Sequence, residues 1–196
     1  MLISIYRSPA QGFSLVELII TMAVAAVLLT ISTISFAGWI ANAKVRTVAE
    51  VLQNALRLAQ TEALKRSRQT AFLLTAGAPT LGATPSATGT NWVVQVLPIV
   101  SAEPPAYVQG GNLREQSSGV IITATAAQIC FNSAGRLVTN LQTGTGTDCM
   151  APASDLLYTI SKAGADRDLK IKLSPAGKIR MCDAAKILSV ANPDGC

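Results

Sequence analysis

A long apolar stretch near the N-terminus dominates this sequence. Between Phe13 and Ala43 the only charged side chain is Glu17. A helix over this stretch would be roughly 46 Å long, which exceeds the roughly 30 Å hydrocarbon core of a bilayer. A carboxylate inside a membrane helix costs on the order of 3 kcal/mol, so Glu17 should have a partner. The stretch predicts a transmembrane helix in which Glu17 is a candidate functional group.

Three simpler interpretations of this stretch are a signal peptide, a plain membrane anchor and a lipoprotein. A cleaved signal peptide would use Arg7 as its basic start and 35–37 as its cleavage site, but Glu17 interrupts the apolar region and the region is too long. A plain membrane anchor explains the length and leaves Glu17 without a reason. A lipoprotein is excluded because no cysteine lies near the segment.

The residues at the start of the stretch resemble a known processing signal. Gly12, Phe13 and Glu17 follow a short leader containing Arg7, as in the class III signal of type IV pilins and type II secretion pseudopilins. In that family a prepilin peptidase cuts after the glycine and methylates the new amino terminus. The resemblance implies a leader over residues 1–12, cleavage between Gly12 and Phe13, and N-methylation of Phe13. It also implies that Glu17 acts in assembly, by neutralising the amino terminus of a neighbouring subunit.

Beyond Ala43 the apolar residues recur at three- and four-residue intervals, which indicates an amphipathic helix. No Gly or Pro occurs between Trp39 and Ala76, so one helix from about Ser14 to Arg68 is expected, with a membrane half over 13–40 and an amphipathic half over 41–68. The basic end of this helix, 65–68, could be a nucleic-acid patch, although cations also suit a helix C-terminus. The expected apolar face is Val45, Val48, Leu52, Ala55, Leu56, Ala59 and Ala63; the expected polar face is Lys44, Glu50, Gln53, Arg57, Gln60 and Glu62.

The remaining part of the 196-residue chain, 69–196, has room for one domain and reads as β-rich. Short β-branched or apolar segments are separated by Gly, Pro, Ser, Thr and Asn, a pattern typical of an antiparallel sheet. Loops are expected at 77–90, 98–105 and 141–147. The predicted strands are 71–75, 92–97, 107–109, 120–123, 128–131, 156–160, 169–173 and 178–182.

The four cysteines, Cys130, Cys149, Cys182 and Cys196, all lie in the last third of the chain. An even number in an exported domain indicates disulfides rather than a zinc site, and four cysteines allow three connectivities. Cys130–Cys149 and Cys182–Cys196 are favoured because each closes a short loop, worth roughly 3 kcal/mol in the chain-entropy model. Free buried thiols are the alternative.

An enzyme is not expected. The sequence has no histidine, no G-x-S-x-G elbow and no P-loop, and its acids show no pairing pattern. We therefore expect no cofactor and no bound metal. The net charge of +5 permits an anionic partner without requiring one.

Two predicted hairpins sharpen the family resemblance. Residues 129–137 and 171–182 each show a strand, a Ser-x-x-Gly type of turn, and a basic residue opening the next strand. With the terminal segment 192–196, they resemble the GspH/FimT/FimU group of minor pilins and pseudopilins; ordinary turn chemistry is the alternative. This resemblance implies an α+β pilin fold, in which a long N-terminal helix packs on an antiparallel β-sheet or sandwich-like head.

The functional expectation that follows is a minor pilin subunit of a type IV pilus. It would assemble with other minor and major pilins at the inner membrane, with a single membrane pass and its head in the periplasm. The alternatives are the H pseudopilin of a type II secretion system and a DNA-capturing minor pilin.

The DNA alternative depends on the second hairpin. Some FimT members are thought to capture DNA through a C-terminal Gly-Arg-x-Arg turn, which Gly177, Lys178 and Arg180 resemble. Lys178 replaces the first arginine and loses the bidentate fork. Arg136 and Lys186 are further candidates for contacting phosphates. In the structural alternative Ile179 and Met181 face the core, while Lys178 and Arg180 face water.

Overall fold

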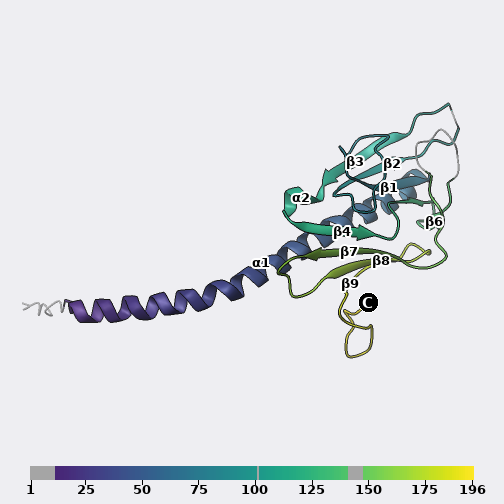
Figure 1. Ribbon diagram of the computed structural model, residues 1–196. Helices are drawn as coiled ribbons and strands as arrows, with labels where there is room; N and C mark the ends of the chain where they lie inside the picture. Colours follow the sequence, from purple (N-terminus) through teal and green to yellow (C-terminus); the bar gives the residue numbers. More distant parts are fainter. Residues whose placement is uncertain (1–11, 101, 141–147) are drawn as a thin grey trace, which may run out of the picture. The chain divides into compact units, whose positions relative to one another are not determined.

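The computed structural model describes residues 12–100, 102–140 and 148–196, without the side chains of 31–35 and 116. The predicted leader, apart from Gly12, and the predicted loop 141–147 lie outside the described residues. The chain forms two compact units, Met1–Ala37 and Gly38–Cys196. Helix α1, Leu15–Arg66, contributes to both (Figure 1).

The expected single long helix is confirmed, and its ends follow local chemistry. At its start the Ser14 hydroxyl accepts a hydrogen bond from the Val16 backbone N–H at 3.3 Å, as a helix-capping side chain does. At its end Ser67 adopts a left-handed conformation with φ 51°, and the Arg68 N–H donates to the Ala63 carbonyl at 3.2 Å. This is the hydrogen-bond pattern of a helix C-terminus whose terminating residue is usually glycine.

In the first unit, the apolar side chains of α1 are open to solvent. The large apolar residues between Leu15 and Leu29 are 51% to 74% exposed. Over the described residues, no helix reaches both the length and the apolar character of a membrane span.

The second unit contains two antiparallel sheets (Figure 1). The five-stranded sheet has the order β3-β2-β1-β5-β6 and the four-stranded sheet the order β4-β7-β8-β9. The strands of the first are β1 Thr70–Thr75, β2 Asn91–Val96, β3 Ala106–Asn112, β5 Gln128–Phe131 and β6 Leu137–Val138. Those of the second are β4 Val120–Ala124, β7 Leu156–Lys162, β8 Leu169–Leu173 and β9 Ile179–Asp183. A short helix, α2 Leu113–Gln116, precedes β4.

The C-terminal part of α1 and the inner faces of both sheets share one hydrophobic core. Every residue of the predicted apolar face of the helix is buried in it. Phe72 on β1 and Tyr158 on β7 meet edge to face there, with ring centroids 6.3 Å apart. Burial raises the pKa of the Tyr158 hydroxyl above its ordinary value. The C-terminal part of α1 is therefore an integral part of the core of the second unit.

Two residues predicted for the polar face of the helix behave differently. Glu62 is buried and forms ion pairs with Arg66 at 2.6 Å and Lys65 at 3.6 Å. It lies three residues after Ala59, so it borders the apolar stripe. Gln60 is partly buried against two turns of the head.

The outer face of the first sheet has a smaller core of its own. Ala71, Leu97, Cys130 and Cys149 are buried together there. All residues that are buried in the described chain lie from Ala41 onward, and both disulfides lie in the second unit. Gly38–Cys196 thus contains all of the buried core and both disulfides that the described residues form.

Candidate assembly motif and basic hairpin surface

The residues of the N-terminal motif are accessible. A side chain at Gly12 would meet no other atom within 4 Å, and Phe13 is 83% exposed. Glu17 lies in the first turn of α1, is exposed, and forms no ion pair with the other described residues. A carboxylate at a helix N-terminus interacts favourably with the helix dipole, which suits Glu17 to its position. The Gly12–Phe13 peptide bond and the Glu17 carboxylate are both open to a partner.

The two hairpin turns singled out in the sequence have the same backbone pattern. In the β5–β6 turn, Gly135 N–H donates to the Asn132 carbonyl at 2.9 Å; in the β8–β9 turn, Gly177 N–H donates to the Ser174 carbonyl at 2.8 Å. Both glycines have left-handed φ angles, 72° and 87°. This is the geometry of a hairpin loop that ends with a glycine bulge.

The two turns belong to different sheets, and Gln60 of α1 joins them. Its side-chain Nε2 donates to the Gly135 carbonyl at 2.9 Å and to the Gly177 carbonyl at 2.8 Å. A Cβ atom at Gly177 would lie 2.0 Å from the Gly135 carbonyl oxygen, so the close approach requires glycine. We name Gln60 and these two turns the glutamine clamp. The sequence placed Gln60 on a solvent-facing stripe, and only the fold reveals its role.

The residues predicted to contact DNA differ in exposure and in whether their charges already have partners within the protein. Lys178 is exposed and makes no ion pair among the described residues. Arg180 is half-buried and donates to the Gly195 carbonyl, while Lys186 pairs with Asp194 at 2.6 Å. Arg136 is exposed and follows Gly135 in the β5–β6 turn. Ile179 and Met181 pack against the core from the opposite face of β9.

Two lysines that were not singled out as site residues join Lys178 and Arg180. Lys172 on β8 lies opposite Arg180 in the strand register, and Lys170 lies opposite Cys182. Side chains of alternate residues share one face of a strand, so these cations occupy the outer face of the hairpin. We name Lys170, Lys172, Lys178 and Arg180 the basic hairpin surface. Lys172 is already paired with Asp155 at 2.9 Å.

The disulfides stabilise the ends of these hairpins. Cys130 is joined to Cys149, and Cys182 to Cys196, which is the pairing that the loop lengths favoured. The prediction of disulfides is confirmed. The second bond closes a C-terminal loop directly after β9.

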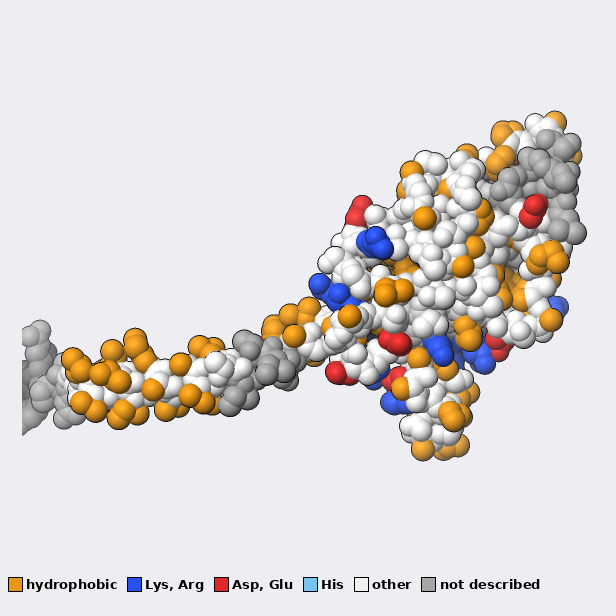
Figure 2. Space-filling view, in the orientation of Figure 1, with side chains coloured by type: hydrophobic (Ala, Val, Ile, Leu, Met, Phe, Trp, Pro, Cys, Tyr) orange, Lys and Arg blue, Asp and Glu red, His pale blue; other side chains and the backbone are white. Residues whose placement is uncertain are grey.

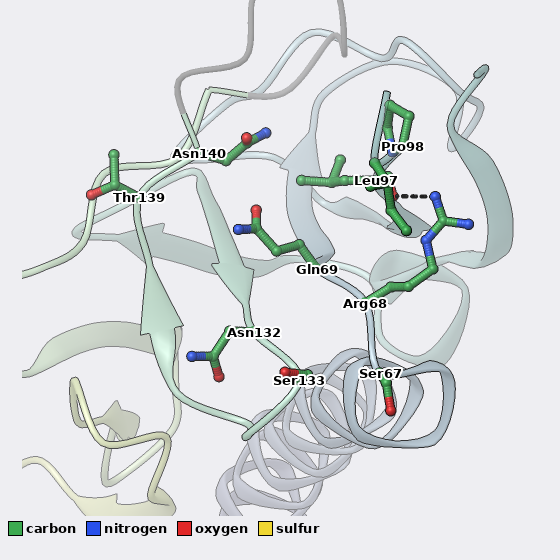
Figure 3. A pocket seen from close by; sticks show the side chains of 10 residues that line it. Ser67, Arg68, Gln69, Leu97, Pro98, Asn132, Ser133, Thr139 and Asn140 are labelled. Carbon is green, nitrogen blue, oxygen red and sulfur yellow. Dashed lines mark hydrogen bonds between the residues drawn. The ribbon is translucent and has the colours of Figure 1, made fainter. Parts of the chain in front are cut away.

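A concavity of about 580 Å³ lies at the C-terminal end of α1 (Figure 3). Its lining combines polar residues such as Arg68, Gln69 and Asn132 with the apolar residues Leu97 and Pro98. The Arg68 guanidinium donates to both carboxylate oxygens of Glu103, at 2.9 and 2.5 Å, and to the Leu97 carbonyl at 3.1 Å. Arg68 is the one charged residue among the described lining residues, and its charge is already neutralised by Glu103.

Two models of known protein families match this chain. Residues 7–33 match the prokaryotic N-terminal methylation motif, and residues 48–177 match the family described as type II transport protein GspH. The second match covers more than half of the chain, so the protein belongs to the GspH family. No curated protein matches the chain.

One solved minor pilin shares the fold, and two further solved structures are less similar. The type IV minor pilin FimU of Pseudomonas aeruginosa is similar with a TM-score of 0.51 and 18% identity, over 72% of this chain and 90% of FimU. E. coli GspH gives a TM-score of 0.47 and 13% identity, over 76% of this chain and 94% of GspH. The minor pseudopilin EpsH from the type 2 secretion system of Vibrio cholerae gives 0.48 and 12%, over 73% of this chain and 99% of EpsH. The expected α+β pilin fold is confirmed.

Proposed function

We propose that this chain is a minor pilin subunit of a type IV pilus and takes part in pilus assembly at the inner membrane. The N-terminal motif implies anchoring in that membrane and processing by a prepilin peptidase. The observation that carries the proposal is the exposed apolar surface of α1 between Leu15 and Leu29. So large an apolar surface requires cover, which lipid provides before assembly and neighbouring helices provide in the fibre.

The proposed path begins with the leader. The peptidase removes residues 1–12 and methylates Phe13, and the apolar part over 13–40 stays in the membrane. The new ammonium group of Phe13 in one subunit then meets the Glu17 carboxylate of its neighbour. A buried carboxylate is tolerated in an apolar environment when it is paired, so this contact explains why the acid is present. The head, 69–196, remains in the periplasm until it is displayed on the fibre as a structural part without catalytic activity.

Mass spectrometry of the N-terminal peptide tests the processing. Assembled fibres should contain a subunit that begins with N-methylated Phe13, because the Gly12–Phe13 bond is accessible. Retention of Met1 to Gly12 in fibres would contradict the proposal.

The second candidate function is that of a pseudopilin in type II secretion, which the description of the matched family favours. Deleting the gene distinguishes the two systems. If the chain is a minor pilin, surface pili are lost or reduced and secretion of exported enzymes is unchanged. If it is a pseudopilin, secretion is lost or reduced and surface pili are unchanged. Complementation with the intact gene should restore whichever activity is lost.

A further inference from the structure

The C-terminal loop displays apolar side chains to solvent. It runs from Ala184 to Gly195 and is closed by the Cys182–Cys196 disulfide. Ile187 is 85% exposed, Leu188 is 50% exposed and Val190 is fully exposed. We name these three residues the aliphatic tip. Figure 2 shows hydrophobic side chains gathered over this protruding loop, with Lys and Arg side chains at its base.

The loop is ordered by its own contacts, so the exposure of the tip is a property of the folded protein. Ser189 and Asn192 exchange two backbone hydrogen bonds of 3.2 Å across the tip. The Cys196 N–H donates to the Lys186 carbonyl at 2.9 Å, and the Lys186 ammonium pairs with Asp194 at 2.6 Å. A constrained loop that presents several aliphatic side chains loses little conformational entropy when it binds.

The aliphatic tip adjoins the basic hairpin surface. Leu188 lines the same concavity, of about 230 Å³, as Lys172, Lys178 and Arg180. Lys178 is exposed and Lys170 is half-buried. Neither forms an ion pair with the other described residues, so neither charge is neutralised by them. The concavity is also lined by Asp155, whose carboxylate forms an ion pair with Lys172.

We propose that the aliphatic tip and the basic hairpin surface together bind an anionic lipid surface. The tip enters the boundary between headgroups and acyl chains, and Lys170 and Lys178 contact lipid phosphates. Peripheral membrane binding of this kind combines buried apolar area with attraction to anionic lipids, and one signal alone binds only weakly. The head has both an exposed apolar loop and neighbouring cations, which are the two features that such binding requires.

The composition of the surface favours lipid over other partners. A nucleic acid would use the cations and gain nothing from three exposed aliphatic side chains, since single strands are bound by aromatic stacking. The energetic hot spots of protein interfaces are enriched in Trp, Tyr and Arg, whereas Leu and Val are under-represented there. This tip is purely aliphatic. Lipid is the partner that uses both halves of the surface.

Vesicle co-sedimentation of Gly38–Cys196 tests this proposal without the apolar N-terminal part of α1, because this unit contains its own core and both disulfides. The vesicles are phosphatidylcholine alone, or phosphatidylcholine with phosphatidylglycerol. Anionic vesicles should bind the unit at least about tenfold more tightly than neutral ones, and the difference should shrink with added salt.

Two variants separate the two contributions. Ile187→Ser with Leu188→Ser and Val190→Ser should weaken binding to anionic vesicles about tenfold or more. Lys170→Gln with Lys178→Gln should weaken it about fivefold per lysine and leave binding to neutral vesicles unchanged.

Two control variants make the same kinds of substitution at exposed positions outside the proposed lipid-binding surface. Ile121→Ser with Met150→Ser removes exposed apolar side chains, and Arg57→Gln with Arg114→Gln removes two charges. Both should bind as the wild type does, and circular dichroism should show every variant folded. Absence of binding to anionic vesicles would overturn the proposal. Binding that survives loss of the tip, and that double-stranded DNA displaces, would overturn it in favour of a nucleic-acid surface.

Discussion

At the scale of single residues, Glu17 is the feature that most separates this chain from a plain membrane anchor. It lies one turn from Phe13, within an otherwise uncharged stretch, and no described residue neutralises it. A carboxylate in this setting raises the free energy of the chain in lipid unless a cation is supplied from outside. In the proposed fibre, the processed amino terminus of a neighbouring subunit supplies that cation.

Replacing Glu17 with alanine should therefore impair assembly and spare insertion. We expect membrane fractions to contain Glu17→Ala at wild-type levels or slightly above, because removal of the charge lowers the cost of insertion by up to about 3 kcal/mol. The amount recovered in sheared fibres should fall several-fold. Glu50→Ala, which changes an exposed acid beyond the uncharged stretch, is the control. Equal recovery of Glu17→Ala and wild type would show that the carboxylate has no essential partner.

Gln60 is the other residue whose role is decided by its contacts. One side-chain amide supplies hydrogen bonds to two backbone carbonyls from two sheets. Alanine at this position would leave both carbonyls without their donor. An unsatisfied buried polar group costs about 1 to 3 kcal/mol.

We expect Gln60→Ala to lower the free energy of unfolding of Gly38–Cys196 by roughly 1 to 3 kcal/mol. Urea titration followed by circular dichroism measures this quantity. Gln53→Ala on the same helix is the matched control. It should change the free energy of unfolding by less than about 0.5 kcal/mol, because Gln53 makes no hydrogen bond of this kind with the other described residues. Similar losses in both variants would show that the glutamine clamp contributes nothing specific.

At the scale of elements, the β8–β9 hairpin limits what DNA could contact. Of the cations on the basic hairpin surface, Lys172 is paired with Asp155, and Arg180 donates to the Gly195 carbonyl. Nucleic-acid affinity depends on the number of phosphates that free cations neutralise. The hairpin therefore offers DNA fewer contacts than its sequence indicates.

Replacing Lys178 and Arg180 together with alanine should have a small effect on DNA binding. We expect the salt dependence of DNA affinity, measured by fluorescence anisotropy at two or more salt concentrations, to change by no more than about one unit of slope. Lys178→Ala alone should account for that change, since Arg180 is engaged within the protein. A loss of two units or more in the folded double variant would instead favour DNA capture.

At the scale of the whole molecule, buried and partly buried acids tie the stability of the head to pH. Arg66 donates a hydrogen bond to Glu62 and lowers the pKa of that carboxyl below its ordinary value of 4.5, against the opposing effect of burial. Arg68 lowers the pKa of Glu103 in the same way. A carboxyl with a lower pKa in the folded state binds fewer protons there than in the unfolded chain. Such a carboxyl contributes its full stabilisation of the folded state when the pH is above the pKa that it has in the unfolded chain. This contribution is lost as the pH falls through the lower pKa that it has in the folded state.

The melting temperature of Gly38–Cys196 should thus stay level above about pH 5 and fall as the pH is lowered below the ordinary carboxyl pKa. Glu62→Gln should reduce that decline and lower stability at neutral pH, because the ion pairs with Arg66 and Lys65 are lost. Glu50→Gln removes an exposed pair with Arg46, which contributes at most about 1 kcal/mol. If the melting temperature of Glu62→Gln falls as steeply at low pH as that of the wild type, groups other than Glu62 cause the acid sensitivity.

The sequence by itself determined the elements and the class of protein. The spacing of Val45, Val48 and Leu52 predicted the buried face of α1, and all eight predicted strands are present with shifts of a few residues at their ends. The hairpin glycines were identifiable because only glycine readily adopts the left-handed angles of those turns. The motif from Gly12 to Glu17 likewise depends on neighbouring residues alone. Such features are local, so periodicity and residue type are sufficient to find them.

Only the tertiary structure decided which residues meet across the fold. Gln60 and Glu62 lie at the edge of the apolar stripe, where helical spacing alone does not distinguish solvent from a neighbouring turn. The division of the strands into two sheets and the pairing of Lys172 with Asp155 depend on contacts between distant segments. The placement of the aliphatic tip beside Lys178 depends on the register of β8 with β9 and on the path of the disulfide-closed loop. These arrangements follow from the packing of a shared core around α1, which no short stretch of sequence encodes.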